Sequence, residues 1–401
     1  MDIDVTLVSM AVGPFNTVLE TSAEAPLIVD VAAEKRGPIG VGVIGLGVFG
    51  RFCLEAYLTM PGIEIVAIAD MNPDALARGL EITPHAVPCD DAALLIAMPE
   101  VEVVTICATP DRHPALVLAA VLAGKHVVCD KPLGVSLAEF DTVVTTASAR
   151  GVALGINLVL RHHPLYIALH HLCASGVLGT PRRLAVENYA DEGIGFGPAH
   201  WFWSRAHSGG LALAADVHWF DLATRMLGPA RVVQAWDVGC DDGIAPRRLV
   251  NTAHGGGAVA TVYHAFDTRP DATSCTVLMA FDEGEARIEG WIPTRLTVAC
   301  PADRATAVAA LLGATALPHV FMGDDNRAVL VLNGGPDRRG DYQEMIRTTL
   351  RLVLDQAEGR GDRNNLAAAR HATATALAAE FAVDSRDRIV IGAEGSLEAT
   401  G

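Results

Sequence analysis

A glycine-rich turn between an apolar run and a helical segment is the feature that most constrains this chain. The run 39–44 has the composition of a buried β-strand, and Gly45-Leu46-Gly47-Val48-Phe49-Gly50 follows it directly. A helix is predicted over 49–60, and a second apolar strand over 63–69 leads into Asp70. A strand, a glycine turn, a helix and a second strand that ends in an acid are typical of a βαβ unit that binds a dinucleotide.

The glycines and the acid of this unit each have a physical reason. Gly45 allows the tight turn, Gly47 lets the backbone approach a pyrophosphate, and Gly50 lets the helix pack closely on the strand. The helix N-terminus would face the phosphates. Asp70 would bond the adenosine ribose and repel a 2′-phosphate, and the next residues offer no guanidinium, so we expect NAD rather than NADP. A purely structural glycine turn with a helix-capping Asp is the alternative.

Apolar strands go on alternating with helices up to about residue 156. Strands are predicted over 101–108, 126–129 and 152–156, and helices over about 114–123 and 136–150. This alternation indicates a parallel sheet covered on both faces. We therefore predict an α/β protein whose N-terminal Rossmann domain, a doubly wound parallel sheet, spans 37–160. An extension over 1–36, with candidate strands over 5–12 and 27–31, precedes it.

The pattern changes after residue 160. Helices are predicted over 165–175, 210–227, 342–357 and 366–381, and strands over 183–189 and at several places within 232–298. We predict a C-terminal α+β domain over 161–401 with a mostly antiparallel open sheet, which serves substrate binding and oligomerisation. Its last helices could pack back on the Rossmann domain. Strands 258–266 and 275–281 are apolar on both faces, so we expect helices on one side and another subunit, in a homodimer or homotetramer, on the other.

Charge and cysteine usage exclude several classes of partner. The formal net charge is −17, and no basic stripe is present, which argues against nucleic acid and anionic membrane as partners. The cysteines are widely spaced without a Cys-x-x-Cys pair, and we see neither a signal peptide nor an apolar run that could span a bilayer. A reducing, cytoplasmic compartment is therefore expected. The pairs His162-His163 and His170-His171 lack further ligands, so no metal site is predicted.

A second motif lies after the strand 126–129. The segment reads Ala123-Gly124-Lys125-His126-Val127-Val128-Cys129-Asp130-Lys131-Pro132-Leu133. With the glycine turn and Thr109-Pro110, it resembles the glucose–fructose oxidoreductase/inositol dehydrogenase (Gfo/Idh/MocA) family over about residues 38–385, although Asp130 stands where that family usually has Glu. The resemblance implies that Lys131 lies beside the nicotinamide, touches the substrate hydroxyl and has a cis bond to Pro132. A lysine at the end of a parallel strand would also face the ligand crevice.

The second half carries a related motif, Ser208-Gly209-Gly210-Leu211-Ala212-Leu213-Ala214-Ala215-Asp216-Val217-His218-Trp219-Phe220-Asp221. It resembles the family's Gly-Gly helix with Asp-x-x-x-His-x-x-Asp, except that Ala214 occupies the first acidic position. By this resemblance His218 accepts the substrate's hydroxyl proton. In a regular helix Asp216 points away from His218, so it could replace the missing acid only if the helix is bulged or starts differently. Asp221 could orient the ring instead, and a structural histidine is the alternative.

The remaining candidates follow from their places near these motifs. Cofactor-binding candidates are Gly45, Leu46, Gly47, Val48, Phe49, Gly50, Asp70, Thr109, Pro110, His113, Asp130 and Lys131. Substrate-binding candidates are Lys131, Asn157, Arg161, Trp201, Arg205, His207 and His218. The aromatic residues of 200–207 could stack on a sugar ring or the nicotinamide, or could only anchor a loop. Catalytic candidates are Lys131, His218, Asp221 and Asp216.

These observations predict an NAD-dependent dehydrogenase acting on CH–OH groups. It would transfer a hydride between NAD and a secondary alcohol of a sugar, polyol or inositol-like substrate, with Lys131 polarising the oxygen and His218 taking the proton. Ala214 motivates the alternative, a non-catalytic NAD- and ligand-binding regulatory protein of the same fold. A dehydrogenase of a carbonyl or imine compound is a third hypothesis, against which the Lys-Pro segment argues.

Overall fold

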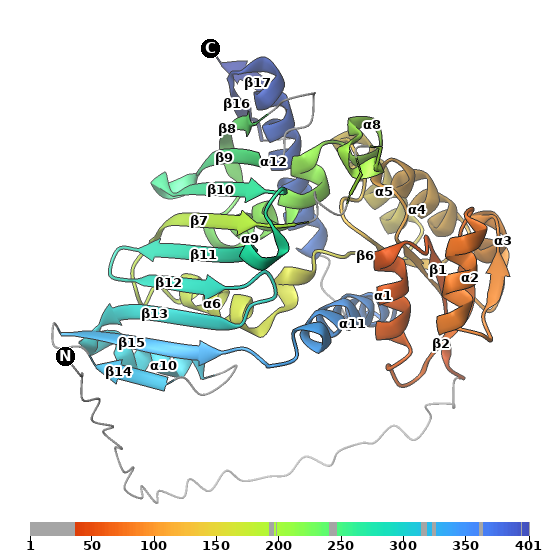
Figure 1. Cartoon of the computed structure of the whole chain (residues 1–401), viewed down its shortest axis with the longest axis horizontal. Helices are drawn as coiled ribbons and strands as arrows, with labels where there is room; N and C mark the ends of the chain where they lie inside the picture. Colours follow the sequence, from red (N-terminus) through yellow and green to blue (C-terminus); the bar gives the residue numbers. More distant parts are fainter. Residues whose placement is uncertain are drawn as a thin grey trace, which may run out of the picture. The chain divides into compact units, whose positions relative to one another are not determined.

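The computed structural model describes residues 37–191, 196–197, 199–239, 247–313, 319–322, 326–360, 364–393 and 395–400. The predicted extension over 1–36, with its two candidate strands, lies outside these residues, and so does Cys240. The elements from Pro38 onward belong to one unit, and Figure 1 labels most of them.

The first sheet is parallel, with strand order β3-β2-β1-β4-β5-β6. Its strands are β1 (Ile39–Ile44), β2 (Ile63–Ala69), β3 (Val87–Cys89), β4 (Val103–Ile106), β5 (His126–Cys129) and β6 (Leu154–Ile156). Its helices are α1 (Val48–Tyr57), α2 (Pro73–Ile82), α3 (Ala92–Ala97), α4 (His113–Leu122) and α5 (Leu137–Ala149). The predicted doubly wound sheet is confirmed. Its order reverses between β1 and β4, where such sheets form a ligand crevice.

Local sequence explains where helices of this sheet begin. Ser136 accepts a hydrogen bond from the Glu139 backbone N–H, and the Glu139 carboxylate accepts from the Ser136 hydroxyl, which makes a capping box. Asn72 caps α2 by accepting from the Asp74 N–H, and Pro73 occupies the first turn. These caps satisfy N–H groups that have no partner inside the helix, so each helix starts at a defined residue.

The second sheet has the order β14-β15-β13-β12-β11-β7-β10-β9-β8-β16-β17. Its strands are β7 (Pro181–Tyr189), β8 (Ala230–Val238), β9 (Arg247–His254), β10 (Val259–Ala265), β11 (Ser274–Phe281), β12 (Glu285–Glu289), β13 (Arg295–Pro301), β14 (His319–Met322), β15 (Arg327–Asn333), β16 (Arg388–Ile391) and β17 (Leu397–Thr400). Among the described strands of this second sheet only β7 and β10 pair in parallel. The predicted mostly antiparallel sheet is confirmed.

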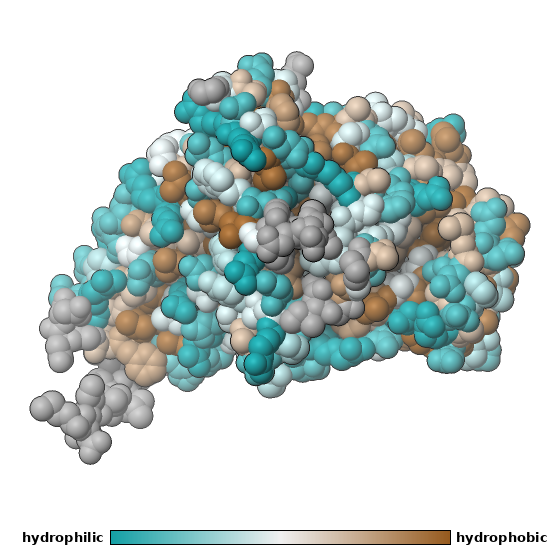
Figure 2. All heavy atoms as spheres, turned by 45° about the horizontal axis from the view of Figure 1, so that its top comes forward, coloured by the Kyte–Doolittle hydropathy of each residue, from teal (hydrophilic) through white to brown (hydrophobic). Residues whose placement is uncertain are grey.

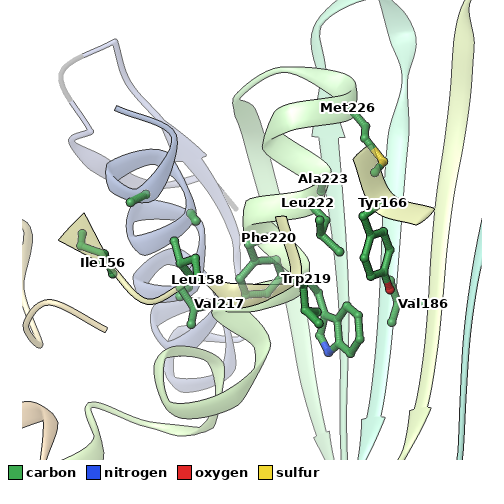
Figure 3. Packing of buried hydrophobic residues seen from close by; sticks show 14 of the residues in the cluster. Ile156, Leu158, Tyr166, Val186, Val217, Trp219, Phe220, Leu222, Ala223 and Met226 are labelled. Atoms are coloured by element: carbon green, nitrogen blue, oxygen red, sulfur yellow. The ribbon is translucent and has the colours of Figure 1, made fainter. Parts of the chain in front are cut away.

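Helices cover one face of this second sheet (Figure 1). They are α6 (Pro164–Ser175), α9 (Val217–Leu227), α10 (Ala305–Leu312) and α12 (Asn364–Ser385). In Figure 3, Trp219 and Leu222 of α9 lie beside Tyr166 of α6 and Val186 of β7, and all four side chains are buried. Burial of one such large apolar side chain stabilises the fold by about 1.5–3 kcal/mol. Along β11, buried residues alternate with half-buried ones, so the opposite face is only partly covered.

The late helix α11 (Arg338–Ala357) packs on the first sheet, where it contacts α1, β5 and β6. Its buried residues Ile346 and Leu350 share a core cluster with Val41 of β1. A Cβ atom on Gly155 would lie 2.6 Å from a methyl group of Val353, so only glycine permits this close approach.

The helix expected over 210–227 is not regular, which corrects the sequence-based prediction. Residues Ala212–Asp216 form a π-helical turn before α9 begins. Gly210 has φ +104°, and a Cβ atom there would lie 2.2 Å from the Glu380 carboxyl carbon. Glu380 accepts a hydrogen bond of 2.7 Å from the Ala212 N–H across 168 positions of sequence. A distant carboxylate therefore occupies the start of this turn.

Polar and apolar residues are interspersed on the face that Figure 2 shows. Exposed large apolar side chains of the second sheet include Trp236 and Val238 of β8, and Phe321 and Met322 of β14. In the part of the chain that the structure describes, no helix is both long and apolar enough to cross a membrane.

Candidate active site

The glycine turn forms a cradle that side chains would block. Gly45 has φ +88°, and a Cβ atom there would lie 2.6 Å from the Cys107 carbonyl carbon. A Cβ atom on Gly50 would lie 1.8 Å from the Gly45 carbonyl oxygen. Nothing lies within 4 Å of the corresponding position on Gly47, and Val48 is 82% exposed. The turn thus presents open backbone at the N-terminus of α1, which fits a pyrophosphate.

Asp70 fastens the end of β2 to this turn. Its Oδ2 accepts a hydrogen bond of 2.7 Å from the Leu46 N–H, and its Oδ1 accepts one of 2.8 Å from the Asn72 N–H. Each oxygen of an ionised carboxylate can accept more than one hydrogen bond. Asp70 therefore keeps acceptor capacity for a ribose hydroxyl while it orders the turn.

His113 lies beneath the loops that follow β4 and β5. Thr109 and Pro110 lead into α4, whose first residue, His113, is fully buried. Its Nδ1 lies 2.7 Å from the Pro132 carbonyl oxygen and its Nε2 lies 2.9 Å from that of Ala108. Burial lowers the pKa of His113. The ring lies between the two loops and contacts a carbonyl oxygen of each. Because the side chain is fully buried there, this geometry does not offer the contact with the cofactor that was expected of His113.

Lys131 reaches the irregular helix from the end of β5. Its peptide bond to Pro132 is cis, as the resemblance implied. Its Nζ donates a hydrogen bond to the Ala214 carbonyl oxygen inside the π-turn, where the regular helical bonding is interrupted. Next to it, burial raises the pKa of the Asp130 carboxyl, while the charges of Lys131 and His113 oppose that rise.

His218 is buried beside this lysine. Burial lowers its pKa well below the ordinary range, and the charges of Lys131 and Arg161 lower it further. Its ring meets that of Trp291 edge-on, with 5.9 Å between the centroids. Its Nδ1 has no hydrogen-bond partner among the described residues. The imidazole is therefore neutral near pH 7, and no carboxylate in the described part of the chain orients it.

Asp221 does not orient His218, in contrast to the expectation from sequence. Arg161 Nε donates to Asp221 Oδ2 at 2.9 Å, and the Nη2 group binds the other oxygen. The side chains of this pair are 1% and 2% exposed. A bidentate guanidinium occupies both oxygens, because its planar donors match the carboxylate geometry.

Asp216 points to a different histidine. Its Oδ1 lies 2.6 Å from Nδ1 of His264, which is on β10, and its Oδ2 has no partner among the described residues. Nε2 of His264 lies 2.6 Å from Nδ2 of Asn188, near the end of β7. The His264 ring stacks on Phe266 with 3.9 Å between the centroids. All of these side chains are buried.

A cleft of about 490 Å³ opens on the other side of Trp291. Its wall consists of the end of β7 with the residues after it, the beginning of β11, the end of β12 with the two residues after it, and the first residue of α11. The lining residues are Asn188, Tyr189, Ala190, Asp191, Thr273, Ser274, Cys275, Thr276, Arg287, Glu289, Gly290, Trp291 and Arg338. Trp291 touches both this cleft and His218, so the two places are neighbours.

None of the predicted substrate residues lines this cleft. Asn157 is buried and accepts a 3.0 Å hydrogen bond from Thr349 Oγ1. Arg205 pairs with Asp384 and Glu380, and His207 Nδ1 lies 3.1 Å from Asp111 Oδ2. Trp201 contacts His200 with 5.4 Å between the ring centroids. These contacts anchor the loop over 199–208.

Sequence analysis did not identify His264, Asn188, Trp291 or Glu380. His264 and Asn188 occupy buried positions of strands in which buried and less buried residues alternate. A polar residue in such a position is a signal that could have been used, because buried polar groups need partners. Among the described residues, no group of His, Cys, Asp or Glu side chains could hold a metal ion.

The fold and this site define a class of protein. A parallel sheet with a glycine cradle, a lysine after its fifth strand and a histidine from a second, antiparallel domain are the parts of a two-domain nucleotide-dependent oxidoreductase. The model of the oxidoreductase family with an NAD-binding Rossmann fold, Gfo/Idh/MocA, matches residues 39–158, and the model of the Gfo/Idh/MocA C-terminal domain matches 166–284. The chain belongs to the Gfo/Idh/MocA family.

Curated relatives include inositol dehydrogenases. An inositol 2-dehydrogenase of Gluconacetobacter diazotrophicus is 35% identical over 146 residues, which cover 35% of this chain and 43% of that protein. A myo-inositol 2-dehydrogenase of Thermotoga maritima is 29% identical over 188 residues, 47% of this chain and 54% of the relative. The chain spans about half the length of the curated relatives that it matches.

Solved structures share the fold over most of the chain. A levoglucosan dehydrogenase in complex with NADH and levoglucosan has a TM-score of 0.73 at 19% identity and covers 88% of this chain and 99% of its own. An Agrobacterium radiobacter oxidoreductase in complex with NAD⁺, L-tartaric acid and magnesium has a TM-score of 0.69 at 18% identity, with coverage of 88% and 99%.

Proposed function

We propose that this protein is an NAD-dependent dehydrogenase that acts on a secondary CH–OH group of a sugar, polyol or inositol-like substrate. One observation carries the proposal: Lys131 and His218, from different domains, lie close enough for the lysine charge to depress the histidine pKa, and Trp291 joins them to a cleft. The inositol and levoglucosan dehydrogenases among its relatives act on substrates of this class.

The residues that would hold the cofactor are those of the glycine cradle and Asp70. The open backbone at Gly47 suits a pyrophosphate, and Asp70 has acceptor capacity for a ribose diol but would repel a 2′-phosphate. This favours NAD over NADP. When bound, the nicotinamide supplies the hydride acceptor or donor.

Lys131 and His218 would manage the substrate oxygen and its proton. The Lys131 ammonium can donate a hydrogen bond to the oxygen of the reacting carbon and stabilise negative charge that develops there. The neutral ring of His218 can accept the hydroxyl proton at Nε2. Its other nitrogen, Nδ1, is the one that is buried without a hydrogen-bond partner among the described residues. Its depressed pKa makes it a weak base, so we expect slow turnover compared with an enzyme that has a carboxylate on Nδ1.

Domain division, assembly and compartment belong to the same proposal. We divide the chain into a cofactor domain over 37–160 and a substrate domain over 161–401. The half-covered face of the second sheet supports a homodimer or homotetramer. The widely spaced cysteines favour a cytoplasmic compartment.

A regulatory protein that binds NAD and a ligand without catalysis is the second candidate. The specific observation in its favour is the unpaired Nδ1 of His218 together with the commitment of Asp221 to Arg161. General acid–base assistance is worth roughly 10²–10⁴ in rate, so its weakening could leave little turnover.

Absorbance of reduced cofactor during incubation of the protein and NAD with myo-inositol, levoglucosan and D-apiose tests the proposal. We expect turnover of at least one compound, and a Lys131→Met variant should lose it by roughly 10²–10⁴-fold while it still binds NAD through the glycine cradle and Asp70. The control is Ala309→Ser, a substitution at a partly buried position of α10 that should leave turnover unchanged. If the protein binds NAD but turns over none of the three compounds, the result would favour the regulatory candidate.

A further inference from the structure

The hydrogen bonds around His264 fix its tautomer. Nδ2 of Asn188 is a donor only, so Nε2 of His264, at 2.6 Å, must accept. The ring proton is then on Nδ1, which donates to Asp216 Oδ1 at 2.6 Å. A neutral ring with its proton on Nδ1 satisfies both contacts at once.

This arrangement also fixes which end of the Asn188 amide is left for a ligand. The amide N–H group is used by His264, so the free group is the carbonyl oxygen Oδ1. This oxygen accepts no hydrogen bond from the described residues, yet it is not among the buried unpaired atoms, and Asn188 lines the cleft. Oδ1 is therefore an accessible acceptor in the cleft wall.

We infer that Asp216, His264 and Asn188 form a relay that makes Asn188 a specificity-determining acceptor for a hydroxyl group of the substrate. Asp216 and His264 are positioning residues: the carboxylate that the helix lacks at 214 is two residues later and acts on the substrate through His264 and Asn188. The inference rests on the proposed function, because the cleft is taken as the place of the substrate's non-reacting hydroxyls.

The chemistry of the acceptor predicts what it selects. A hydroxyl can donate to Oδ1, whereas a methylene, a methoxy group or a carbonyl at that place cannot. A site built to receive a hydrogen bond rejects the analogue that lacks the donor more strongly than an apolar site would, because the bound analogue displaces water from the acceptor and leaves it unpaired.

Nitrogen-15 NMR of protein labelled at histidine tests the relay without any substrate. The His264 signal is assigned by its disappearance in His264→Gln. We expect a neutral ring protonated at Nδ1 near pH 7. A ring protonated at Nε2, or at both nitrogens, would mean that Asn188 presents its amide oxygen to His264 and its NH₂ group to the cleft. That result would overturn the inference even if the protein is an active dehydrogenase.

Kinetics with myo-inositol and NAD, or with levoglucosan if only that compound is turned over, test the substrate role. His264→Phe keeps the stacking on Phe266 and Asn188→Ala removes the acceptor; each should raise KM about three- to tenfold, the effect of one neutral hydrogen bond, with kcat within about twofold. His264→Gln should restore part of the loss, since its side-chain oxygen can accept from Asn188. The monodeoxy analogue that lacks the recognised hydroxyl should show equal KM in the unaltered protein and in Asn188→Ala.

His254→Gln is the matched control. His254 is a buried histidine on the neighbouring strand β9, with 2.9 Å from Nε2 to Thr252 Oγ1 and 2.7 Å from Nδ1 to the Gly228 carbonyl oxygen, and it does not line the cleft. Its KM should equal that of the unaltered protein. Equal KM values in His264→Phe, Asn188→Ala and the unaltered protein would refute the inference. Absence of turnover with every compound would refute the proposed function instead, and the NMR result would still decide the relay.

Discussion

The glycine turn over 45–50 and the turn-and-helix over 209–221 both bring a functional group to the site, but they are organised differently. The first is ordered by residues of its own βαβ unit, since Gly50 packs on Gly45 and Asp70, at the end of β2, binds Leu46. The second is ordered from far away: Glu380 binds the Ala212 N–H, and Arg161 holds Asp221. A motif predicts its own geometry only where its partners lie within the short strand–helix–strand unit that the motif predicts.

The dependence of the second region on a distant ion pair gives the largest expected effect. Asp221→Ala removes the carboxylate that binds the buried Arg161 guanidinium through both oxygens, so it should lower the free energy of unfolding by about 3–5 kcal/mol. Chemical denaturation followed by circular dichroism measures this. The same substitution at Asp282, whose partner Arg182 is half exposed, should change stability little. Equal losses at the two sites would contradict the comparison.

The two kinds of glycine in the first region can be separated. Gly50→Ala puts a Cβ atom 1.8 Å from the Gly45 carbonyl oxygen, so both thermal stability and NAD affinity should fall, the affinity by roughly a hundredfold, or about 2.7 kcal/mol. Gly47→Ala meets nothing within 4 Å and should reduce NAD affinity alone. Fluorescence titration and thermal melting of both variants test this. A melting temperature lowered equally in the two variants would contradict it.

Acid should destabilise the segment before α6, which contains Arg161, the partner of Asp221 in the second region. His163 caps α6 by accepting from the Leu165 N–H, and burial lowers its pKa to about 4. Because this pKa is depressed in the folded state, stability is complete above about pH 6.5 and falls as the pH drops towards 4, by about 2 kcal/mol at pH 5.

His163→Asn keeps a capping acceptor but does not titrate, so the loss of stability between pH 7 and pH 5 should shrink by that amount in denaturation curves. Some loss should persist, since burial also lowers the pKa of the adjacent His162 to about 3. An unchanged acid loss in His163→Asn would refute the assignment.

The smallest effect concerns the cofactor preference of the first region. Asp70→Ser removes the negative charge beside the ribose, so the ratio of NADP to NAD dissociation constants should fall by about tenfold, or 1.4 kcal/mol. Because Asp70 also binds the Leu46 N–H, affinity for NAD should fall as well. Titration with both dinucleotides checks the ratio. Equal or tighter binding of NADP by the unaltered protein would show that Asp70 does not select the cofactor.

The sequence by itself determined the parallel sheet and the glycine cradle, while the cis bond of Lys131 was implied by the resemblance to the family. These features depend on short-range rules: apolar runs of strand length, backbone angles that only glycine adopts easily, and a motif in which every part is adjacent. The mostly antiparallel second sheet was also evident from its successive strands.

Only the tertiary structure decided what surrounds His218. The π-turn over Ala212–Asp216 depends on Glu380, and the direction of Asp216 depends on His264, a residue from another strand. From the spacing along one helix we could weigh Asp216 and Asp221 as partners of His218. The spacing could not show that Asp221 binds Arg161 and that Asp216 binds His264. Side-chain pairing across elements is set by packing in three dimensions, which the spacing of residues along the chain does not contain.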